Sequence, residues 1–300
     1  MQVTKRVQYN SRRLFLESAY MSRPGSPSPA ACAPANLPPV GLPPPRVRQI
    51  RWSTADLQTA WEAKAAPPCP RAKAALQDSL WHSLATEYDA RHLSAFLRQQ
   101  PMPLSPAFWA MERAWAEDED NHFRGLSWLY TRLYDVSEAE IAARLGERTP
   151  DFSRLAPLLS DEFRLCVVLA FDELASTRAY AHDAVSYAAL GVAARILVRR
   201  LARDELLHCH NAIDLLVRTQ ARRLPEVEAV IEWVIAHDTS PQFSYRATFL
   251  LDQIIKPVIS PESTSSNPYS TIGLSADFLQ DCGRCLMRFL YRAQNHINPC

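Results

Sequence analysis

The chain has 300 residues, which is long enough to bury a sizeable core in one or two domains. It carries 33 Lys and Arg against 32 Asp and Glu, and this near-neutral balance argues against a nucleic-acid-binding protein. Only 7 residues are Gly, which favours a helical protein over a β-rich one. No apolar run approaches the roughly 18–20 residues that cross a bilayer, so we expect no membrane span.

The N-terminal part differs in composition from the rest of the chain. Residues 1–30 carry five basic residues and Glu17 as their only acid, a composition compatible with an organelle transit peptide. The alternative is a disordered extension, or an upstream start codon before Met21, and it makes the cytoplasm the expected compartment. Residues 22–48 are a Pro/Ala/Ser tract that cannot build a core. We therefore expect a disordered segment at 1–48 and a folded domain at 49–300.

The first two long helices are predicted from periodicity and from a cap. Four residues recur at four-residue steps: Leu76, Leu80, Leu84 and Tyr88. This spacing predicts a helix over about 71–100. Ser105 as N-cap and Pro106 at the first helical position predict a second helix that runs to about Tyr134.

Further helices are predicted along the rest of the chain, over 137–145, 160–182, 185–218, 225–237, 241–257 and 275–296. The helix at 185–218 is apolar on one side and rich in Arg on the other. A polar Pro/Ser loop at 259–271 separates the last two helices. We therefore expect a core bundle at about 71–218 with additional C-terminal helices at 224–296.

The cysteines are scattered along the chain, at Cys32, Cys69, Cys166, Cys209, Cys282, Cys285 and Cys300. An odd number of dispersed cysteines is typical of reduced cytosolic thiols and not of a disulfide framework. Cys282 and Cys285 form a single CxxC within an apolar helical pattern. Because no partner pair accompanies it, this motif favours a structural role over a metal or redox site.

Two of the long helices carry the same Glu-x-x-His pattern. Residues three apart on a helix are neighbours on one face, so each pair can direct both side chains to one point. A carboxylate with an imidazole suits iron or manganese. The other two long helices each carry an inward-facing glutamate, so every long helix contributes to one candidate ligand set. These ligands are Glu87, Glu119, His122, Glu173, Glu205 and His208.

This set has the composition of a dinuclear site in a helical bundle, with one Glu from each of two helices and Glu-x-x-His from each of the others. Glu173 lies in an apolar helix, where an unpaired carboxylate is costly and a metal centre would satisfy it. The alternative is that the carboxylates pair with arginines of neighbouring helices. Glu87 also has competitors on its own helix, at His82, Asp89 and His92. The sequence predicts an all-α, ferritin-like four-helix bundle that binds two ferrous ions per chain, with a Mn/Fe pair as the alternative.

At these residues the chain resembles the soluble acyl-carrier-protein (acyl-ACP) desaturases, a ferritin-like di-iron family. The family signatures read roughly RAWxAEENRH and DEKRHE, where this chain has RAWAEDEDNH at 113–122 and DELLH at 204–208. FDELAS at 171–176 resembles the family sequence FQERAT. Upstream, Ser105-Pro106 and Trp109-Ala110 resemble an SPxxWA run of the same family. The resemblance covers about residues 76–215.

The resemblance implies an O₂-dependent di-iron oxidase that inserts a double bond into a carrier-bound acyl chain. It makes Ser176 and the adjacent Thr177 candidates for assisting O₂ activation. It makes Asp204 an acid that orients a ligand histidine, in line with the general need for such partners. Trp52 matches an N-terminal tryptophan near the di-iron site of the family.

The chain departs from the family at Asn121, at Leu206-Leu207 and over its last third, which leaves the acyl chain length and the position of oxidation open. A second hypothesis is a di-iron oxygenase of specialised metabolism that catalyses hydroxylation, N-oxygenation or C–C cleavage. A third is a non-enzymatic iron-binding helical protein. A buried apolar tunnel would support the desaturase, and a short polar cavity would support the oxygenase.

Partners follow from the resemblance. Desaturation requires two electrons from outside, and no dinucleotide fingerprint appears in the sequence, so a ferredoxin-type donor is implied. An acidic carrier protein would need a basic surface. The candidate residues for it are Arg195, Arg199, Arg200 and Arg203, or Arg218, Arg222 and Arg223. The alternative is that these arginines form solvated helix faces. A homodimer is the family expectation.

Overall fold

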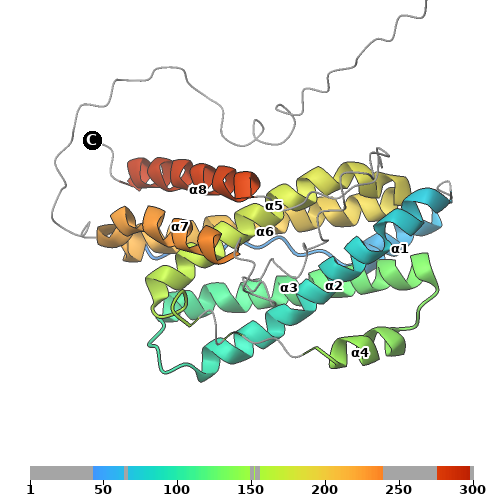
Figure 1. The fold of residues 1–300 in the computed structure, drawn as a ribbon, viewed down its shortest axis with the longest axis horizontal. Coiled ribbons are helices and arrows are strands. Elements are labelled where there is room, and N and C mark those ends of the chain that lie inside the picture. Colours follow the sequence, from blue (N-terminus) through green and yellow to red (C-terminus); the bar gives the residue numbers. More distant parts are fainter. Residues whose placement is uncertain (1–42, 64–66, 149–151, 153–155, 239–275, 298–300) are drawn as a thin grey trace, which may run out of the picture. The chain divides into compact units, whose positions relative to one another are not determined.

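The computed structural model describes residues 43–63, 67–148, 152, 156–238 and 276–297. Within these residues all regular secondary structure is helical and there is no strand, which confirms the all-α prediction (Figure 1). The α-helices are α1 (Thr54–Glu62), α2 (Pro70–Gln99), α3 (Pro106–Tyr134), α4 (Glu138–Gly146), α5 (Glu162–Tyr187), α6 (Val192–Thr219), α7 (Val227–Asp238) and α8 (Ala276–Ile297). Two short 3-10 helices, η2 (Ala188–Leu190) and η3 (Ala221–Glu226), precede α6 and α7. None of the described helices is both long and apolar enough to cross a membrane.

Most predicted helices agree with the structure to within two residues at each end. The Ser105 hydroxyl accepts a hydrogen bond from the Phe108 amide at 3.1 Å, as expected of the N-cap of α3. The predicted helix at 241–257 and the predicted loop at 259–271 lie outside the described residues, as do residues 1–42.

The predicted boundary between the third and fourth long helices was wrong. The prediction ended one helix at 182 and began the next at 185, whereas α5 continues to Tyr187 and α6 begins at Val192. The break lies at Gly191, whose φ of 114° suits a residue without a side chain. Val185 is 80% exposed, so its apolar character does not mark the start of a buried face.

Helix α1 was not predicted from the sequence. It begins after Ser53, whose hydroxyl accepts a hydrogen bond from the Ala55 amide at 3.1 Å. Leu57 is its one fully buried residue, and α1 packs mainly on α6. Residues 43–48, assigned in the prediction to the disordered segment, are described and form an extended stretch without helix.

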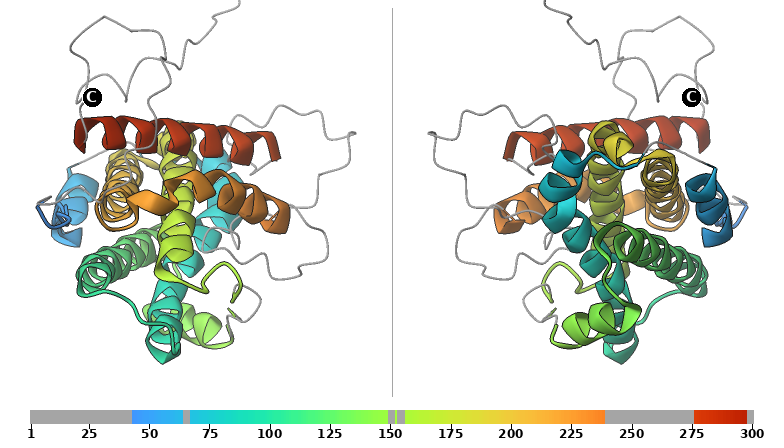
Figure 2. Two further views of the ribbon diagram at one scale, coloured as in Figure 1. Left: turned by 90° about the vertical axis from the view of Figure 1, so that its left-hand side faces the viewer. Right: turned by 90° about the vertical axis from the view of Figure 1, so that its right-hand side faces the viewer.

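Four long helices form the centre of the fold as two closely packed pairs, α2 with α3 and α5 with α6. Contacts between α3 and α6 and between α2 and α5 join the pairs. Helix α7 packs on α5 and α8, and α8 packs on both α5 and α6. Helix α8 lies on the opposite side of the bundle from α4 (Figures 1 and 2).

Two hydrophobic clusters fill the bundle, one toward each end. Representative residues of the first cluster are Leu93, Trp115, Leu169 and Ile213. Those of the second are Leu80, Leu129, Tyr187 and Leu197. Helices α2 and α6 run from the second cluster to the first, whereas α3 and α5 run the other way. Because α3 and α5 are parallel, the connection that contains α4 crosses the length of the bundle.

Candidate metal centre

The six predicted ligands meet midway along the bundle, between the two hydrophobic clusters. Helix α2 contributes one residue, α5 one, and α3 and α6 two each. Each is at most 7% exposed. They form two overlapping groups, in each of which one candidate ligand atom per residue lies within 4.8 Å of all the others. Position A is Glu87, Glu119, His122 and Glu205, and position B is Glu119, Glu173, Glu205 and His208.

In position A the imidazole of His122 faces three carboxylates. Its Nδ1 lies 3.3 Å from Glu87 Oε2, 3.4 Å from Glu205 Oε1 and 3.9 Å from Glu119 Oε2. The buried Tyr180 hydroxyl donates a hydrogen bond to the other oxygen of Glu87. Sequence reasoning did not identify Tyr180, which follows Glu173 by two helical turns.

Position B has the same arrangement around His208. Its Nδ1 lies 3.0 Å from Glu205 Oε2, 3.3 Å from Glu119 Oε1 and 3.4 Å from Glu173 Oε2. The Trp115 indole donates a hydrogen bond to Glu173 Oε1 at 2.7 Å. Glu119 and Glu205 belong to both positions and could bridge two ions.

The outer nitrogen of each histidine faces a buried aspartate from the facing helix. His122 Nε2 lies 3.5 Å from Asp204 Oδ2, and His208 Nε2 lies 3.2 Å from Asp118 Oδ2. These contacts direct both Nδ1 atoms toward the carboxylates. The Trp52 indole donates to Asp204 Oδ2 at 2.7 Å and stacks on His122 with ring centroids 6.4 Å apart.

Asp118 was missed in the sequence, although a signal was present. Each aspartate directly precedes the Glu of a Glu-x-x-His pair, so the repeated motif is Asp-Glu-x-x-His. Asp118 precedes Glu119 but contacts His208, and Asp204 precedes Glu205 but contacts His122. This exchange between helices depends on their packing and could not be seen in the linear pattern.

The competitors of Glu87 on α2 lie elsewhere. Asp89 pairs with Arg148, whose Nε lies 3.2 Å from its carboxylate. His92 packs edge-on against Tyr88, with ring centroids 5.5 Å apart. Among the described residues, the two groups that could hold a metal ion do not include His82, Asp89 or His92.

The shifts in pKa within the cluster indicate that its buried carboxylates favour bound protons or cations. Burial, with the neighbouring carboxylates, raises the pKa of Glu119 well above its ordinary value. Burial, with the charge of Glu205, raises the pKa of Glu173 to about 8. Burial would lower the pKa of His122 and His208, but the carboxylates outweigh it and raise both. Burial would raise the pKa of Glu205, but the charge of His122 and hydrogen bonds from both histidines lower it.

These residues fit a pair of divalent cations. The four carboxylates, once ionised, balance the charge of two such ions, and each position supplies an imidazole. Glu119 Oε1 is buried and makes no hydrogen bond of good geometry within the described part of the chain. A buried carboxylate oxygen of this kind is costly unless a cation satisfies it.

The two hydroxyl residues predicted to assist O₂ activation lie one turn beyond Glu173 on α5. Both Ser176 and Thr177 are half-buried. The Thr177 hydroxyl donates to the Glu173 backbone carbonyl at 2.7 Å. Because they follow Glu173 by three and four residues, both lie on the same side of α5 as Glu173. Their catalytic role stays a prediction.

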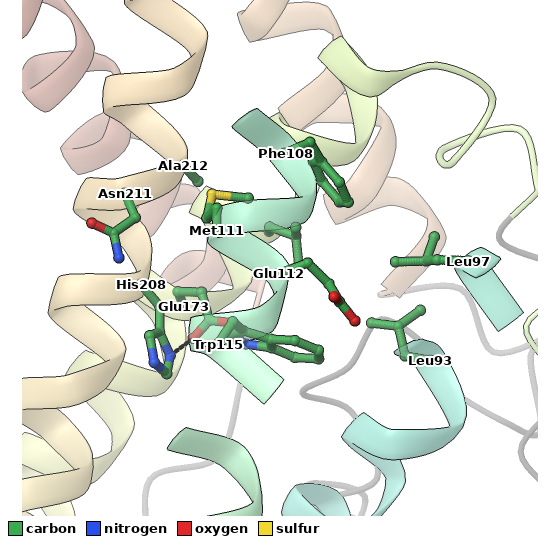
Figure 3. A pocket seen from close by; sticks show the side chains of 11 residues that line it. Leu93, Leu97, Phe108, Met111, Glu112, Trp115, Glu173, His208, Asn211 and Ala212 are labelled. Carbon is green, nitrogen blue, oxygen red and sulfur yellow. Dashed lines mark hydrogen bonds and ion pairs between the residues drawn. The ribbon is translucent and has the colours of Figure 1, made fainter. Parts of the chain in front are cut away.

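A narrow pocket opens from position B between α2, α3, α5 and α6 (Figure 3). Glu173 and His208 lie at one end with Trp115 beside them, as Figure 3 shows. The remaining lining is mostly apolar: Leu93, Leu97, Phe108, Met111, Leu169 and Ala212. Glu112 and Asn211 are the polar exceptions.

The arginines predicted to form a docking surface are partly engaged in ion pairs within the chain. Four of them pair with acids: Arg200 with Asp56, Arg203 with Asp204, Arg218 with Asp214, and Arg223 with Asp161 and Glu226. Arg195, Arg199 and Arg222 are exposed. A docking role for these residues stays a prediction.

The CxxC motif lies on α8 and outside the metal cluster. Cys282 is fully buried, and burial raises its pKa to about 12, which disfavours the reactive thiolate. Cys285 is partly buried, and both are free thiols.

Comparisons with models of known protein families, with curated proteins and with solved structures found no match. The class to which the protein belongs is therefore inferred from its own structure. It is a helical bundle with a buried carboxylate and histidine cluster that could hold two metal ions.

Proposed function

We propose that this chain is a ferritin-like di-iron protein that uses O₂ to oxidise a substrate. The observation that carries the proposal is the buried cluster of four carboxylates and two imidazoles at the middle of four helices. Parallel α3 and α5 joined by one long crossover are the connectivity of ferritin-like bundles. Carboxylate oxygen together with imidazole suits iron, and manganese is the chemically closest alternative.

The reaction that we propose first is insertion of a double bond into a carrier-bound acyl chain, as the resemblance to acyl-ACP desaturases implies. The lining of the pocket beside Glu173 and His208 is mostly apolar, which agrees with an apolar substrate, but its cavity volume of about 10 Å³ would have to widen to admit an acyl chain. When bound, a pair of ferrous ions supplies the reactivity toward O₂ needed to cleave an unactivated C–H bond. Two further electrons would come from a ferredoxin-type donor, and the chain would act as a homodimer.

The protein's own residues would position the ligands and exclude water. Asp204 and Asp118 would each hold the proton on the outer nitrogen of a histidine, which leaves Nδ1 free to coordinate. Trp115 would fix the orientation of Glu173, and Tyr180 would fix that of Glu87. Because the cluster is buried, bulk water has little access to the reacting centre.

One observation favours the oxygenase as a second candidate. Glu112 is only 2% exposed and lines the pocket, where it accepts hydrogen bonds from Ser94 at 2.6 Å and Arg98 at 3.1 Å. A buried carboxylate is an unfavourable neighbour for a plain hydrocarbon chain. A substrate with a polar group near Glu112 would fit hydroxylation, N-oxygenation or C–C cleavage better.

The metal is tested first. The purified chain is loaded anaerobically with ferrous iron, and iron per chain and the optical spectrum after O₂ addition are measured. We expect two ions per chain, with loss of iron in Glu119→Ala and Glu205→Ala. Glu228→Ala, an exposed residue of α7, is the matched control. Iron binding that is absent, or unchanged in the two cluster variants, would mean that the carboxylates are structural and would end the proposal.

The reaction is tested next with the iron-loaded protein, a ferredoxin reducing system and acyl-ACP. Product mass separates the candidates, because desaturation removes two hydrogens whereas hydroxylation adds an oxygen. An iron-loaded protein that oxidises no acyl-ACP would reject the desaturase assignment and leave the metal centre intact.

A further inference from the structure

Both aspartates that face the cluster histidines are contacted from outside by one extended segment, residues 46–52, which we call the strap. The strap lies along α6 through its backbone. The Arg46 amide donates to Asp214 Oδ2 at 2.9 Å. The Arg48 amide donates to Asn211 Oδ1 at 2.8 Å, and Asn211 Nδ2 donates back to the Arg48 carbonyl at 2.9 Å. These bonds fix the register of the strap against the helix and so decide which of its side chains reach the cluster.

Two side chains of the strap contact the aspartates. The Trp52 indole donates to Asp204, which faces His122 of position A. Gln49 Nε2 donates to Asp118 Oδ1 at 3.1 Å, and the other oxygen of Asp118 faces His208 of position B. Each metal position is thus connected to the strap through one aspartate and one histidine.

The two connections differ in strength. Asp204 accepts from the indole at 2.7 Å and from the Arg203 guanidinium at 2.8 Å, so both of its oxygens are held by firm donors. At Asp118 the donor from the strap is the neutral amide of Gln49. That amide nitrogen is also shared with the Ala114 carbonyl at 3.2 Å and the exposed Glu117 carboxylate at 3.4 Å. If Asp204 lost one of its two donors, the other would still hold it, whereas Asp118 would lose its donor from the strap if Gln49 were removed. The orientation of Asp118 therefore depends more on Gln49 than the orientation of Asp204 depends on either of its donors.

We infer that Gln49 is a positioning residue for metal position B, acting through Asp118 and His208. Its amide holds Asp118 so that the aspartate accepts the proton on His208 Nε2, which leaves Nδ1 directed at Glu119, Glu173 and Glu205. Removal of a residue bonded directly to a ligand histidine, as Asp118 would be, lowers metal affinity by about 10- to 100-fold in known sites. Gln49 acts one residue further out, so its removal should cost less. The inference rests on the proposed metal centre but not on the identity of the substrate.

The experiment compares stepwise anaerobic binding of ferrous iron in the wild-type chain and in Gln49→Ala. We expect one of the two ions to bind up to about 10-fold more weakly in Gln49→Ala, the lower end of the range for direct partners, while the other keeps its affinity. Mössbauer spectra of half-loaded protein should then show iron mainly in one environment. Gln58→Ala, on the exposed face of α1, is the matched control and should bind both ions normally.

Trp52→Phe supplies the reciprocal comparison, because it removes the indole donor from Asp204. We expect it to weaken the other ion, so that the two variants leave different spectra in half-loaded protein. Normal binding of both ions by Gln49→Ala, or equal weakening of both, would overturn the inference while leaving the metal centre established. A wild-type protein that binds no metal would instead overturn the proposed function. Circular dichroism confirms that each variant is folded before the affinities are compared.

Discussion

Loading of the cluster with two divalent ions should release protons, and the number can be worked out from the site. The raised pKa values of His122 and His208 leave both imidazoles protonated in the metal-free protein near neutral pH. Glu173, with a pKa of about 8, keeps a proton as well, and the pKa of Glu119, raised well above normal by burial and neighbouring carboxylates, favours a fourth. All four groups must lose these protons to become ligands, so we expect about four protons to be released per pair of ions at pH 7.

The same count sets the pH dependence of metal binding. Groups with raised pKa values hold their protons below those values, so acid competes with the metal and affinity rises with pH. While all four groups are protonated, the product of the two binding constants should increase by up to about 10⁴ per pH unit. The slope should flatten as pH rises through about 8, where Glu173 loses its proton before any metal binds.

Calorimetric titration with ferrous iron in two anaerobic buffers of different ionisation enthalpy measures the protons released. Glu228→Ala should release the same number as the wild type, because it is exposed and outside the cluster. Release of only about two protons would show that Glu119 and Glu173 are ionised in the metal-free protein. That result would refute the inference that burial keeps the carboxyl groups of Glu119 and Glu173 protonated in the metal-free protein.

Two further predictions concern packing around the cluster. Trp115→Phe removes the 2.7 Å hydrogen bond to Glu173 and should weaken binding of one ion by about 1.5–3 kcal/mol, measured by anaerobic titration with the fold checked by circular dichroism. Gly125→Ala should lower the free energy of unfolding by about 1–3 kcal/mol in denaturant titrations, since its Cβ would lie 2.7 Å from Leu197 Cδ1. Gly146→Ala is its control, because that Cβ would meet nothing within 4 Å. Equal stability of the two glycine variants would contradict close packing of α3 on α6.

The helices and the cluster of carboxylates and histidines were predictable because both depend on local spacing. Ser105 and Pro106 mark the start of α3 whatever the helix packs against. Likewise, Glu-x-x-His places two side chains on one face of any helix, and α3 and α6 both carry it. Glu173 could be identified because an acid within a long apolar helix requires a partner.

The features that were missed depend on how separate segments pack. Tyr180 reaches Glu87, and Asp118 reaches His208, only because of the relative rotation and height of the helices. The contact of Gln49 with Asp118 depends on a strap without regular structure, for which periodicity gives no signal. Trp52 was found by resemblance to a family and not from its spacing.

The two candidate metal positions face different surroundings, and this difference bears on how a substrate would reach the site. The pocket is lined by Glu173 and His208, which belong to position B alone, and by neither Glu87 nor His122 of position A. A substrate in the pocket would therefore approach the cluster from position B. Trp115 lines the same pocket and donates to Glu173, so a substrate pressing on the indole would act on a ligand of position B first. At position A, Tyr180 donates to Glu87 and the ring of Trp52 stacks on His122, so an ion held there would lie farther from a substrate in the pocket.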